Sequence, residues 1–539
     1  MSDSPTSAAA LLVDCLIAQG CERIFTVPGE SFLAVLDALL ERPQIDLVTC
    51  RQEGGAAFMA AADGALTGRP GIAFVTRGPG ATNASIGVHV AHQDSQPMIL
   101  FVGDVARPMQ GREGFQEIDF PAFFRADRQV GRADRRSAAH PRTGGARLCR
   151  GDQRAARPGG ARPARGHARR SRARQPCPAP HGAAPGPGGV PRCLAALLDL
   201  IADAASPVAI IGGAGWNAKA RHYFQQFAER IGLPVATAFR RQDAIAPDSP
   251  VYAGNLGYGP NPKLVERVRN ADLILAVGAR LGEATTEGYT LPSPDHPGQV
   301  LVHVHPDPEE LGRVYRTDLA LCCSVDEFAE CAALWDTGAI IPFGAGAEAH
   351  REWLEWASPK PSSAALDSGH VRGRHARGAA CRYDHLQRGG QFCRLVAPLL
   401  ALQPPIPASL PPPAGRWAMA CPPRWPRRCA SPSAAWSRLP GDGDFLMNGQ
   451  ELATAAQYGA NLLVVVVDNG AYGTIRMHQE REYPGRVSAT TLANPDFAAL
   501  ARAFGGWSAR AETTEAFIAA LTEAKDRARH PPDPCRDRS

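Results

Sequence analysis

Hydrophobic and polar positions along the first 125 residues alternate between a helical and a strand-like pattern. Apolar residues recur at helical spacing in some segments, and in others they form short runs typical of strands buried on both faces. The helical segments are 7–18, 32–40 and 53–66, and the strand segments are 24–27, 46–50, 71–76 and 98–102. This alternation predicts a parallel sheet with helices on both faces, and its ligands should bind at the carboxyl ends of the strands.

Two later stretches repeat this alternation, one beginning near Leu194 and the other near Gly441. The first has predicted strands at 207–211, 272–278 and 300–303 and a helix through Phe227 and Ile231, and the second has a predicted helix at 451–458 and a strand at 462–467. The fold class predicted is therefore α/β, with three doubly wound parallel-sheet domains. We place them at about 1–190, 191–345 and 346–539.

Length and composition are those of an ordinary soluble protein. The 539 residues exceed what one compact core can hold and suggest about three to four domains. With 44% hydrophobic residues, 21% charged residues and a net charge of +5, we expect neither nucleic acid nor a membrane as a partner.

Targeting and redox signals favour a cytoplasmic protein. The N-terminal segment has no basic stretch and its apolar residues are helically spaced, which argues against a signal peptide. The longest apolar run near the end, 462–467, is too short to cross a bilayer. The 14 cysteines form no CxxC pair, so we expect reduced thiols.

The third unit contains two polar clusters that suit a metal ion and a diphosphate. The run 441–445 (GDGDF) precedes the predicted helix, and the run 468–472 (DNGAY) follows the predicted strand. Asp442 and Asn469 lie 27 positions apart (469 − 442), enough for one helix and one strand, so the crossover returns both clusters to one sheet edge. Glycines let backbone N–H groups approach a diphosphate, and Mg²⁺ takes carboxylate, amide and carbonyl oxygens. A lone GDG is ordinary turn chemistry, but this combination favours the metal–diphosphate interpretation.

This segment resembles the cofactor-anchoring motif of thiamine-diphosphate enzymes, in which GDG is followed at crossover distance by NN. The resemblance implies that Asp442, the side chain of Asn469 and the carbonyl of Ala471 hold Mg²⁺. Asp468 stands where the family has its first Asn, a departure that should not cost the metal, and Asp444 stands where the family often has serine. The positions implied to bind the cofactor are Gly441, Gly443, Asp444, Phe445, Ala471 and Tyr472.

The N-terminal unit resembles the pyrimidine-binding domain of the same family, and of acetolactate synthases in particular. The resemblance runs through FTVPGESFLAVLDAL, CRQEGGAAFMAAADGALTGRPGIAFVTRGPGATNA and DSQPMILFVGD. In the family a glutamate, here Glu53, hydrogen-bonds the aminopyrimidine ring, which then removes the C2 proton of the thiazolium so that the carbanion can add to a keto acid. Outside this motif, Glu53 would be a solvated glutamate at a helix N-terminus. The other positions assigned to the cofactor pocket are Gly29, Gly78, Pro79, Gly80 and Asn83, although a tight turn explains 78–80 equally well.

Two positions bear on which reaction follows. Phe115-Gln116 matches the FQ pair of acetolactate-synthase-like carboligases, whose glutamine faces the bound intermediate, whereas simple pyruvate decarboxylases usually have two histidines there. Glu30 lies where those decarboxylases often carry an aspartate. With Glu53, these three are the candidate catalytic residues. The resemblance implies carboligation of 2-keto acids, with non-oxidative decarboxylation as the alternative.

The central unit resembles the family's middle domain, which binds FAD in true acetolactate synthases. The glycine run 212–215 after a strand is a weak phosphate-loop signal that tight packing explains equally well. The turn 277–280 (VGAR) fits FAD-binding relatives, whereas 281–283 (LGE) departs from their acidic run. FAD therefore stays an open alternative at this point.

The sequence also breaks in places. From Val130 to Val190 there is no Ile, Phe, Tyr, Met, Trp, Lys, Asn or Glu, and such a composition cannot build a core. A basic RNA-binding arm would be one interpretation, but aromatic residues are not interleaved with the arginines. We favour a GC-rich gene read out of frame.

The stretch 417–426 (WAMACPPRWP) tests this interpretation, because Trp and Met each have a single codon. Regrouping its codons from one base earlier gives Leu/Met/Val, Gly, a choice that includes Tyr, Gly, Leu/Met/Val and Pro/Ser. The family has a GYGxPA-type run at this distance before GDG. We predict that residues of about 127–190, 370–440 and 527–539 are frame-shifted.

In the family the cofactor lies between the first domain of one subunit and the third of another. The resemblance therefore implies a homodimer or homotetramer that binds thiamine diphosphate and Mg²⁺. A further alternative is an inactive, frame-shifted product of such a gene.

Overall fold

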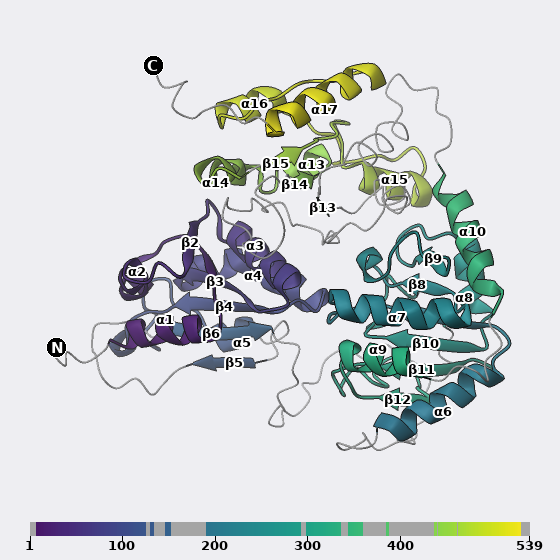
Figure 1. Cartoon of the computed structure of the whole chain (residues 1–539). Helices are drawn as coiled ribbons and strands as arrows, with labels where there is room; N and C mark the ends of the chain where they lie inside the picture. Colours follow the sequence, from purple (N-terminus) through teal and green to yellow (C-terminus); the bar gives the residue numbers. More distant parts are fainter. Residues whose placement is uncertain are drawn as a thin grey trace. The chain divides into compact units, whose positions relative to one another are not determined.

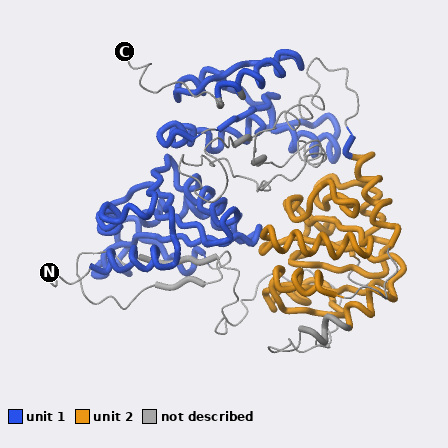
Figure 2. The backbone as a smooth tube through the Cα atoms, viewed as in Figure 1, with its two compact units in different colours: residues 1–152, 357–539 blue, residues 153–356 orange. Residues whose placement is uncertain are grey.

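A computed structural model gives the fold of two compact units, residues 1–152 with 357–539, and residues 153–356 (Figures 1 and 2). The residues that the structure describes are 7–124, 130–133, 146–151, 190–292, 298–335, 343–358, 384–386, 436–438, 440–460 and 462–529.

The first sheet has the strand order β2-β1-β3-β4-β6-β5. The pairs among β2, β1, β3 and β4 are parallel, and β6 and β5 pair antiparallel. Its strands are β1 (Arg23–Thr26), β2 (Asp46–Thr49), β3 (Gly71–Thr76), β4 (Met98–Gly103), β5 (Val130–Ala133) and β6 (Ala146–Gly151). Its helices are α1 (Ala8–Ala18), α2 (Leu33–Leu40), α3 (Glu53–Thr67), α4 (Arg77–Gln93) and α5 (Phe120–Phe123).

Helices cover both faces of this sheet, as the hydrophobic pattern predicts. One buried cluster joins α3 and α4 to side chains such as Phe25 and Val75, and the other joins α1 and α2 to Ile24 and Phe74. Neighbouring strand residues thus point to opposite faces and both are buried, which explains the continuous apolar runs. The helices α3 and α4 approach closely at Gly87, because this residue has no side chain. A Cβ there would lie 2.4 Å from the Cβ of Ala57, which is too close for any other residue.

Strands β5 and β6 extend the first sheet beyond β4, although their composition does not suit a core. Strand β6 pairs antiparallel with β4, and β5 pairs antiparallel with β6. Backbone hydrogen bonds do not require apolar side chains, so the segment can pair without forming a core. The sheet is therefore parallel over four strands only. The rest of the segment proposed to be frame-shifted lies outside the described residues.

The second unit contains a six-stranded, wholly parallel sheet of order β12-β11-β10-β7-β8-β9. The chain reverses its direction across the sheet between β7 and β10, which is the topological switch point where such sheets bind ligands. The strands are β7 (Pro207–Ile211), β8 (Val235–Thr237), β9 (Tyr252–Asn255), β10 (Leu273–Val277), β11 (Val300–Val304) and β12 (Leu319–Leu321). The helices are α6 (Val190–Asp203), α7 (Ala218–Ile231), α8 (Pro262–Arg269), α9 (Val325–Leu334) and α10 (Ala345–Ala357).

The third sheet is short and parallel, in the order β13-β14-β15. Its apolar run predicts a strand through Val467, but β15 ends at Val464 because its partner strands are only three residues long. Val467 rejoins by a single parallel bridge to Gly441. The elements are β13 (Asp384–Leu386), β14 (Trp436–Arg438), α13 (Asp442–Phe445), α14 (Leu452–Gln457), β15 (Leu462–Val464), α15 (Gly473–Glu482), α16 (Phe497–Ala503) and α17 (Thr514–Arg529).

Two further predictions concern described residues: the frame shift proposed from residue 527 and the reduced state of the cysteines. The segment proposed to be frame-shifted from 527 begins inside α17, where Arg527 pairs with Glu523 at 3.0 Å. Cys21 and Cys50 are free thiols, and burial raises the pKa of Cys21 to about 11. In the part of the chain that the structure describes, no helix is long and apolar enough to cross a membrane.

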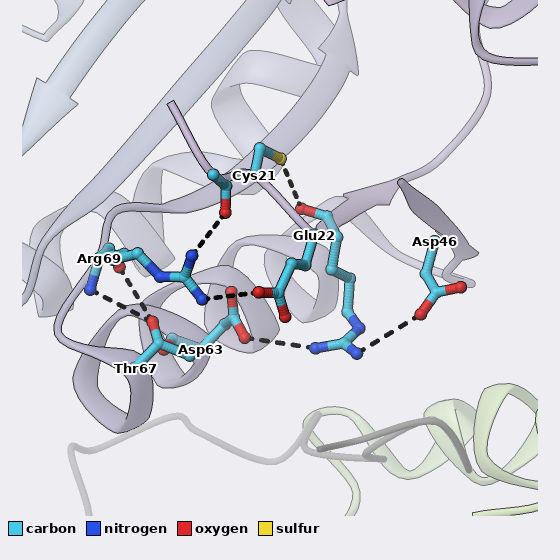
Figure 3. A network of polar contacts seen from close by, with 8 residues as sticks. Cys21, Glu22, Asp46, Asp63, Thr67 and Arg69 are labelled. Carbon is cyan, nitrogen blue, oxygen red and sulfur yellow. Dashed lines mark hydrogen bonds and ion pairs between the residues drawn. The ribbon is translucent and has the colours of Figure 1, made fainter. Parts of the chain in front are cut away.

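A network of ion pairs and hydrogen bonds lies at the amino-terminal ends of β1 and β2 (Figure 3). The buried Arg23 side chain lies 3.4 Å from the Asp63 carboxylate and 3.6 Å from that of Asp46. Arg69 donates to the carbonyl of Gly20 and to Glu22. Burial outweighs the attraction of the two arginines and raises the pKa of Asp63 from an ordinary 3.8 to about 6.

This shift predicts a pH-dependent stability. The folded protein holds the Asp63 proton more tightly than the unfolded chain does. The contribution of Asp63 to the free energy of unfolding therefore grows as the pH falls from about 6 towards 4, and this contribution is lost as the pH rises through about 6. At about 1.4 kcal/mol per pKa unit, the difference reaches about 3 kcal/mol. Urea unfolding of wild type and Asp63→Asn at pH values on either side of this window measures it. The variant should lack this component, and equal pH slopes for the two proteins would contradict the prediction.

Candidate cofactor site

The loop after β1 packs directly on the end of β3, at the carboxyl edge where the sheet predicts a site. A Cβ on Gly29 would lie 2.3 Å from the Cβ of Thr76, so only glycine allows this approach. The hydroxyls of Ser31 and Thr76 are 2.7 Å apart and join the two segments. Gly29 thus shapes the site by letting two backbones meet.

Glu30 forms an ion pair in this loop. Its carboxylate lies 2.9 Å from the guanidinium of Arg77, the first residue of α4. Arg77 has φ +37°, in the left-handed region, which is a sparsely populated conformation for a residue with a side chain. The sequence predicts Glu30 as a candidate catalytic residue but gives no signal of this partner.

Glu53 lies at the first position of α3 and faces α4. Its carboxylate accepts a hydrogen bond of 2.9 Å from the Nδ2 of Asn83, and a Cβ on Gly80 would lie 3.6 Å from Oε1. The preceding Gln52 caps the helix by accepting from the N–H of Gly55. Three of the predicted positions, Glu53, Gly80 and Asn83, therefore meet at the starts of two adjacent helices, with Glu53 half-buried.

Gln116 reaches the same edge through its backbone. Its carbonyl accepts from the N–H of Gly78 at 2.9 Å, and a Cβ on Gly78 would meet that oxygen at 2.7 Å. Gln116 itself has φ +65°. Phe115 is 75% exposed, so within this chain its ring contributes little packing. Pro79 lies between the two glycines in the first turn of α4.

The two polar runs, 441–445 and 468–472, come together at the end of the apolar run, as the predicted crossover requires. The N–H of Asp442 donates to the carbonyl of Val467 at 3.1 Å, which fixes the start of α13 beside the end of the apolar run. Asp442 is 2% exposed. A Cβ on Gly443 would lie 2.6 Å from the ring of Tyr472, so glycine is required there for close packing. The ring of Phe445 is buried and packs edge-on against Phe497.

Asn494 is a site residue that the sequence analysis misses. Its Nδ2 donates to Asp442 at 2.6 Å and to Asp468 at 2.7 Å, so one amide joins the two carboxylates. Its Oδ1 is buried and has no hydrogen-bond partner among the described residues. The approach depends on residues 490–492, which hydrogen-bond antiparallel to 470–472. Asn494 precedes Pro495 and reads in the sequence as an ordinary turn.

The residues that follow the bridge at Val467 carry oxygen atoms of the kind that Mg²⁺ binds. Asn469 and Ala471 follow the bridge at Val467, and the Asn469 side chain accepts from the Ala471 N–H at 3.0 Å. Each of their oxygens keeps a second lone pair, and the Oδ1 of Asn494 adds an acceptor without a donor. The described residues contain no group of three His, Cys, Asp or Glu side chains placed for a metal. A cation here would therefore depend on amide and carbonyl oxygens beside Asp442, a donor set that fits Mg²⁺.

In the second unit, two glycine turns meet at the switch point. A Cβ on Gly213 would lie 1.9 Å from the carbonyl oxygen of Gly278, and one on Gly278 would lie 2.6 Å from that of Gly212. Arg280, at the end of the turn 277–280, lies 3.5 Å from Glu310, and burial raises the pKa of Glu310. The Nε2–H of His303 donates to the carbonyl of Ala279 at 2.8 Å, and burial lowers the pKa of His303 to about 4. Tight turn packing accounts for these glycines.

Comparison with known families identifies three successive domains. Residues 6–123 match the thiamine pyrophosphate enzyme N-terminal TPP binding domain, residues 194–331 match the central domain, and residues 429–531 match the C-terminal TPP binding domain. The chain belongs to the thiamine pyrophosphate enzymes.

Individual relatives place it with the acetolactate synthases of this family. It is 30% identical to the acetolactate synthase large subunit of Parasynechococcus marenigrum over 93% of this chain and 82% of the relative. It is 27% identical to the acetolactate synthase isozyme 2 large subunit of Escherichia coli over 93% of this chain and 90% of the relative. It is 26% identical to the acetolactate synthase large subunit of Haemophilus influenzae over 96% of this chain and 92% of the relative. The chain is thus an acetolactate-synthase-like thiamine pyrophosphate enzyme by descent.

Proposed function

We propose that the protein is a thiamine-diphosphate-dependent carboligase that decarboxylates a 2-keto acid such as pyruvate and transfers the remaining unit to a second carbonyl. The observation that carries the proposal is the meeting of Glu53, Gly80 and Asn83, with Gly78 held by Gln116, at the carboxyl edge of the first sheet. Bound thiamine diphosphate would supply the electron sink for decarboxylation.

Each cluster has a role in this proposal. The Glu53 carboxylate would bind the aminopyrimidine ring, and Asn83 would hold that carboxylate in place through its 2.9 Å hydrogen bond. Asp442, Asn469 and the carbonyl of Ala471 would hold Mg²⁺ at the diphosphate. Gly441 would leave room for the diphosphate, because among the described residues a Cβ there would meet nothing nearer than Asp444 at 3.9 Å, whereas Gly443 lets the chain pack against the Tyr472 ring beside it. Asn494 would hold the carboxylates of Asp442 and Asp468 in fixed positions by donating a hydrogen bond to each.

Carboligation is favoured over simple decarboxylation because Gln116 stands where decarboxylases usually have histidines that transfer protons. Glu30, which pairs with Arg77, stands where those decarboxylases often carry an aspartate and is the observation for the alternative. The test is product analysis with pyruvate, thiamine diphosphate and Mg²⁺. A hydroxy-keto acid supports the proposal, whereas free acetaldehyde as the main product would replace it with non-oxidative decarboxylation.

The proposed enzyme is a cytoplasmic homo-oligomer, and FAD is a further candidate ligand. Large apolar side chains around α13 and α15 are exposed, among them Met447 at 54% and Ile475 at 54%, which supports burial by a second subunit in a homodimer or homotetramer. We propose a cytoplasmic location. FAD would lie at the switch point between β7 and β10, near Arg280, and a flavin absorption spectrum of the purified protein decides whether it does.

Residues of about 127–190, 370–440 and 527–539 are proposed to be read out of frame. The family matches are compatible with this for 127–190 and 370–428, because they leave 124–193 and 332–428 uncovered, whereas the C-terminal match at 429–531 overlaps 429–440 and 527–531. Genomic sequencing across codons 120–195 and 365–445 tests it. Single-base corrections that restore strand and helix patterns and a GYGxP run would support the proposal. An unchanged reading frame would place the shifts in the gene itself and remove the claim of activity for this polypeptide.

A further inference from the structure

Glu451 contacts the segment that leads into α3, within the same compact unit. It lies just before α14, and the residue is only 3% exposed. Its Oε1 accepts hydrogen bonds of 3.0 Å from the backbone N–H groups of both Arg51 and Gln52. Its Oε2 accepts from the Thr454 hydroxyl at 2.6 Å. A buried carboxylate is costly unless its lone pairs are used, and here protein donors bind both oxygens.

The contact lies directly before Glu53. Arg51 and Gln52 lead into α3, where the first backbone N–H groups have no partner within the helix. The carboxylate therefore fixes the two peptide groups that set where Glu53 begins the helix. Gly55 belongs to the same arrangement, because a Cβ there would lie 2.6 Å from the Oε1 of Glu451.

A second contact from the same segment offers a natural control. The Tyr458 hydroxyl accepts from the N–H of Thr49 at 2.8 Å and donates to the carbonyl of Leu47 at 3.2 Å. It thereby joins the end of α14 to β2. Both contacts connect the same two parts of the chain, but only that of Glu451 adjoins Glu53.

We propose that Glu451 is a positioning residue for Glu53, holding the start of α3 so that the Glu53 carboxylate stays in its working orientation. This inference rests on the proposed function, since it gives Glu53 a task that requires orientation. Small displacements of a reacting group can cost about 10²-fold in rate, so two peptide groups fixed by one carboxylate can have a large effect on turnover.

The experiment compares full-length wild type, Glu451→Gln, Glu451→Ala and Tyr458→Phe by two readouts. The first is amide hydrogen exchange in the peptide containing residues 51–55, measured without cofactor. The second is the exchange rate of the thiamine diphosphate C2 proton on the Mg²⁺-loaded protein, together with kcat and KM for pyruvate. Expected for Glu451→Ala are faster amide exchange, slower C2 exchange by about 10-fold to 10²-fold, a matching fall in kcat and an unchanged KM.

The variants separate positioning from simple structural support. Glu451→Gln keeps one acceptor oxygen and should restore part of the loss, whereas Tyr458→Phe should lower stability but leave C2 exchange near wild type. Equal C2 exchange in Glu451→Ala and Tyr458→Phe would overturn the inference. So would unchanged amide exchange at 51–55. Absence of C2 exchange in wild type would instead defeat the proposed function and the catalytic part of this inference with it, and the amide readout would still decide whether Glu451 holds the helix start.

Discussion

Glu53→Gln is expected to lower turnover of pyruvate by about 10²–10⁴-fold while leaving cofactor binding nearly intact. The amide keeps the size of the side chain and can still accept from Asn83, but it loses the negative charge that the proposed contact with the aminopyrimidine ring requires. The C2 exchange rate of bound thiamine diphosphate measures the same step before any substrate binds. It should fall in parallel with kcat.

Glu41→Gln is the matched control for this experiment. Its side chain is 85% exposed beyond the end of α2, so the same chemical change should have no effect on turnover. If Glu53→Gln retained wild-type kcat and C2 exchange, Glu53 would not have the role proposed here. A loss of both activity and folding, seen in circular dichroism, would instead assign Glu53 a structural role through Asn83.

Asp442→Asn is expected to weaken Mg²⁺-dependent binding of thiamine diphosphate by about 10²-fold or more. Asp442 is buried, lies at the start of α13 and supplies the proposed site's central negative charge. The asparagine keeps one oxygen that can accept from Asn494, but it removes this negative charge. Isothermal titration with a range of Mg²⁺ concentrations measures the change, and higher Mg²⁺ should recover part of the affinity.

Asp496→Asn makes the same substitution in the same unit, outside the proposed site. Asp496 caps α16 by accepting from the N–H of Ala499, and asparagine caps helices about equally well. This variant should bind like wild type. Equal binding by Asp442→Asn and Asp496→Asn would mean that the metal site lies elsewhere.

Much of the fold follows from local patterns in the sequence. Strands β1, β3 and β4 and helix α3 lie within a residue or two of their predicted bounds, because each combines a clear hydrophobic period with a defined helix cap or a neighbouring turn. The shortness of β15 could not be predicted, because it depends on the three-residue partners β13 and β14. The antiparallel pairing of β6 likewise has no signal in its own composition.

The candidate site divides in the same way. Glu53 and Asp442 stand in motifs, so their positions could be predicted from the sequence and from the resemblance. Three partners could not be, because each lies far along the chain from the residue that it contacts. Asn494 joins Asp442 across 52 residues, Arg77 pairs with Glu30 across 47, and Glu451 reaches Arg51 across 400. Hydrophobic periodicity carries no information on such side-chain pairs.

A titration of thiamine diphosphate into the full-length protein, with and without Mg²⁺, tests whether this chain holds the cofactor as proposed. We expect saturable binding that requires Mg²⁺, because the proposed ligands Asp442, Asn469 and Ala471 would hold the diphosphate through the metal ion. No binding under either condition, or equal binding without Mg²⁺, would contradict it and leave this chain with its descent from the thiamine pyrophosphate enzymes alone.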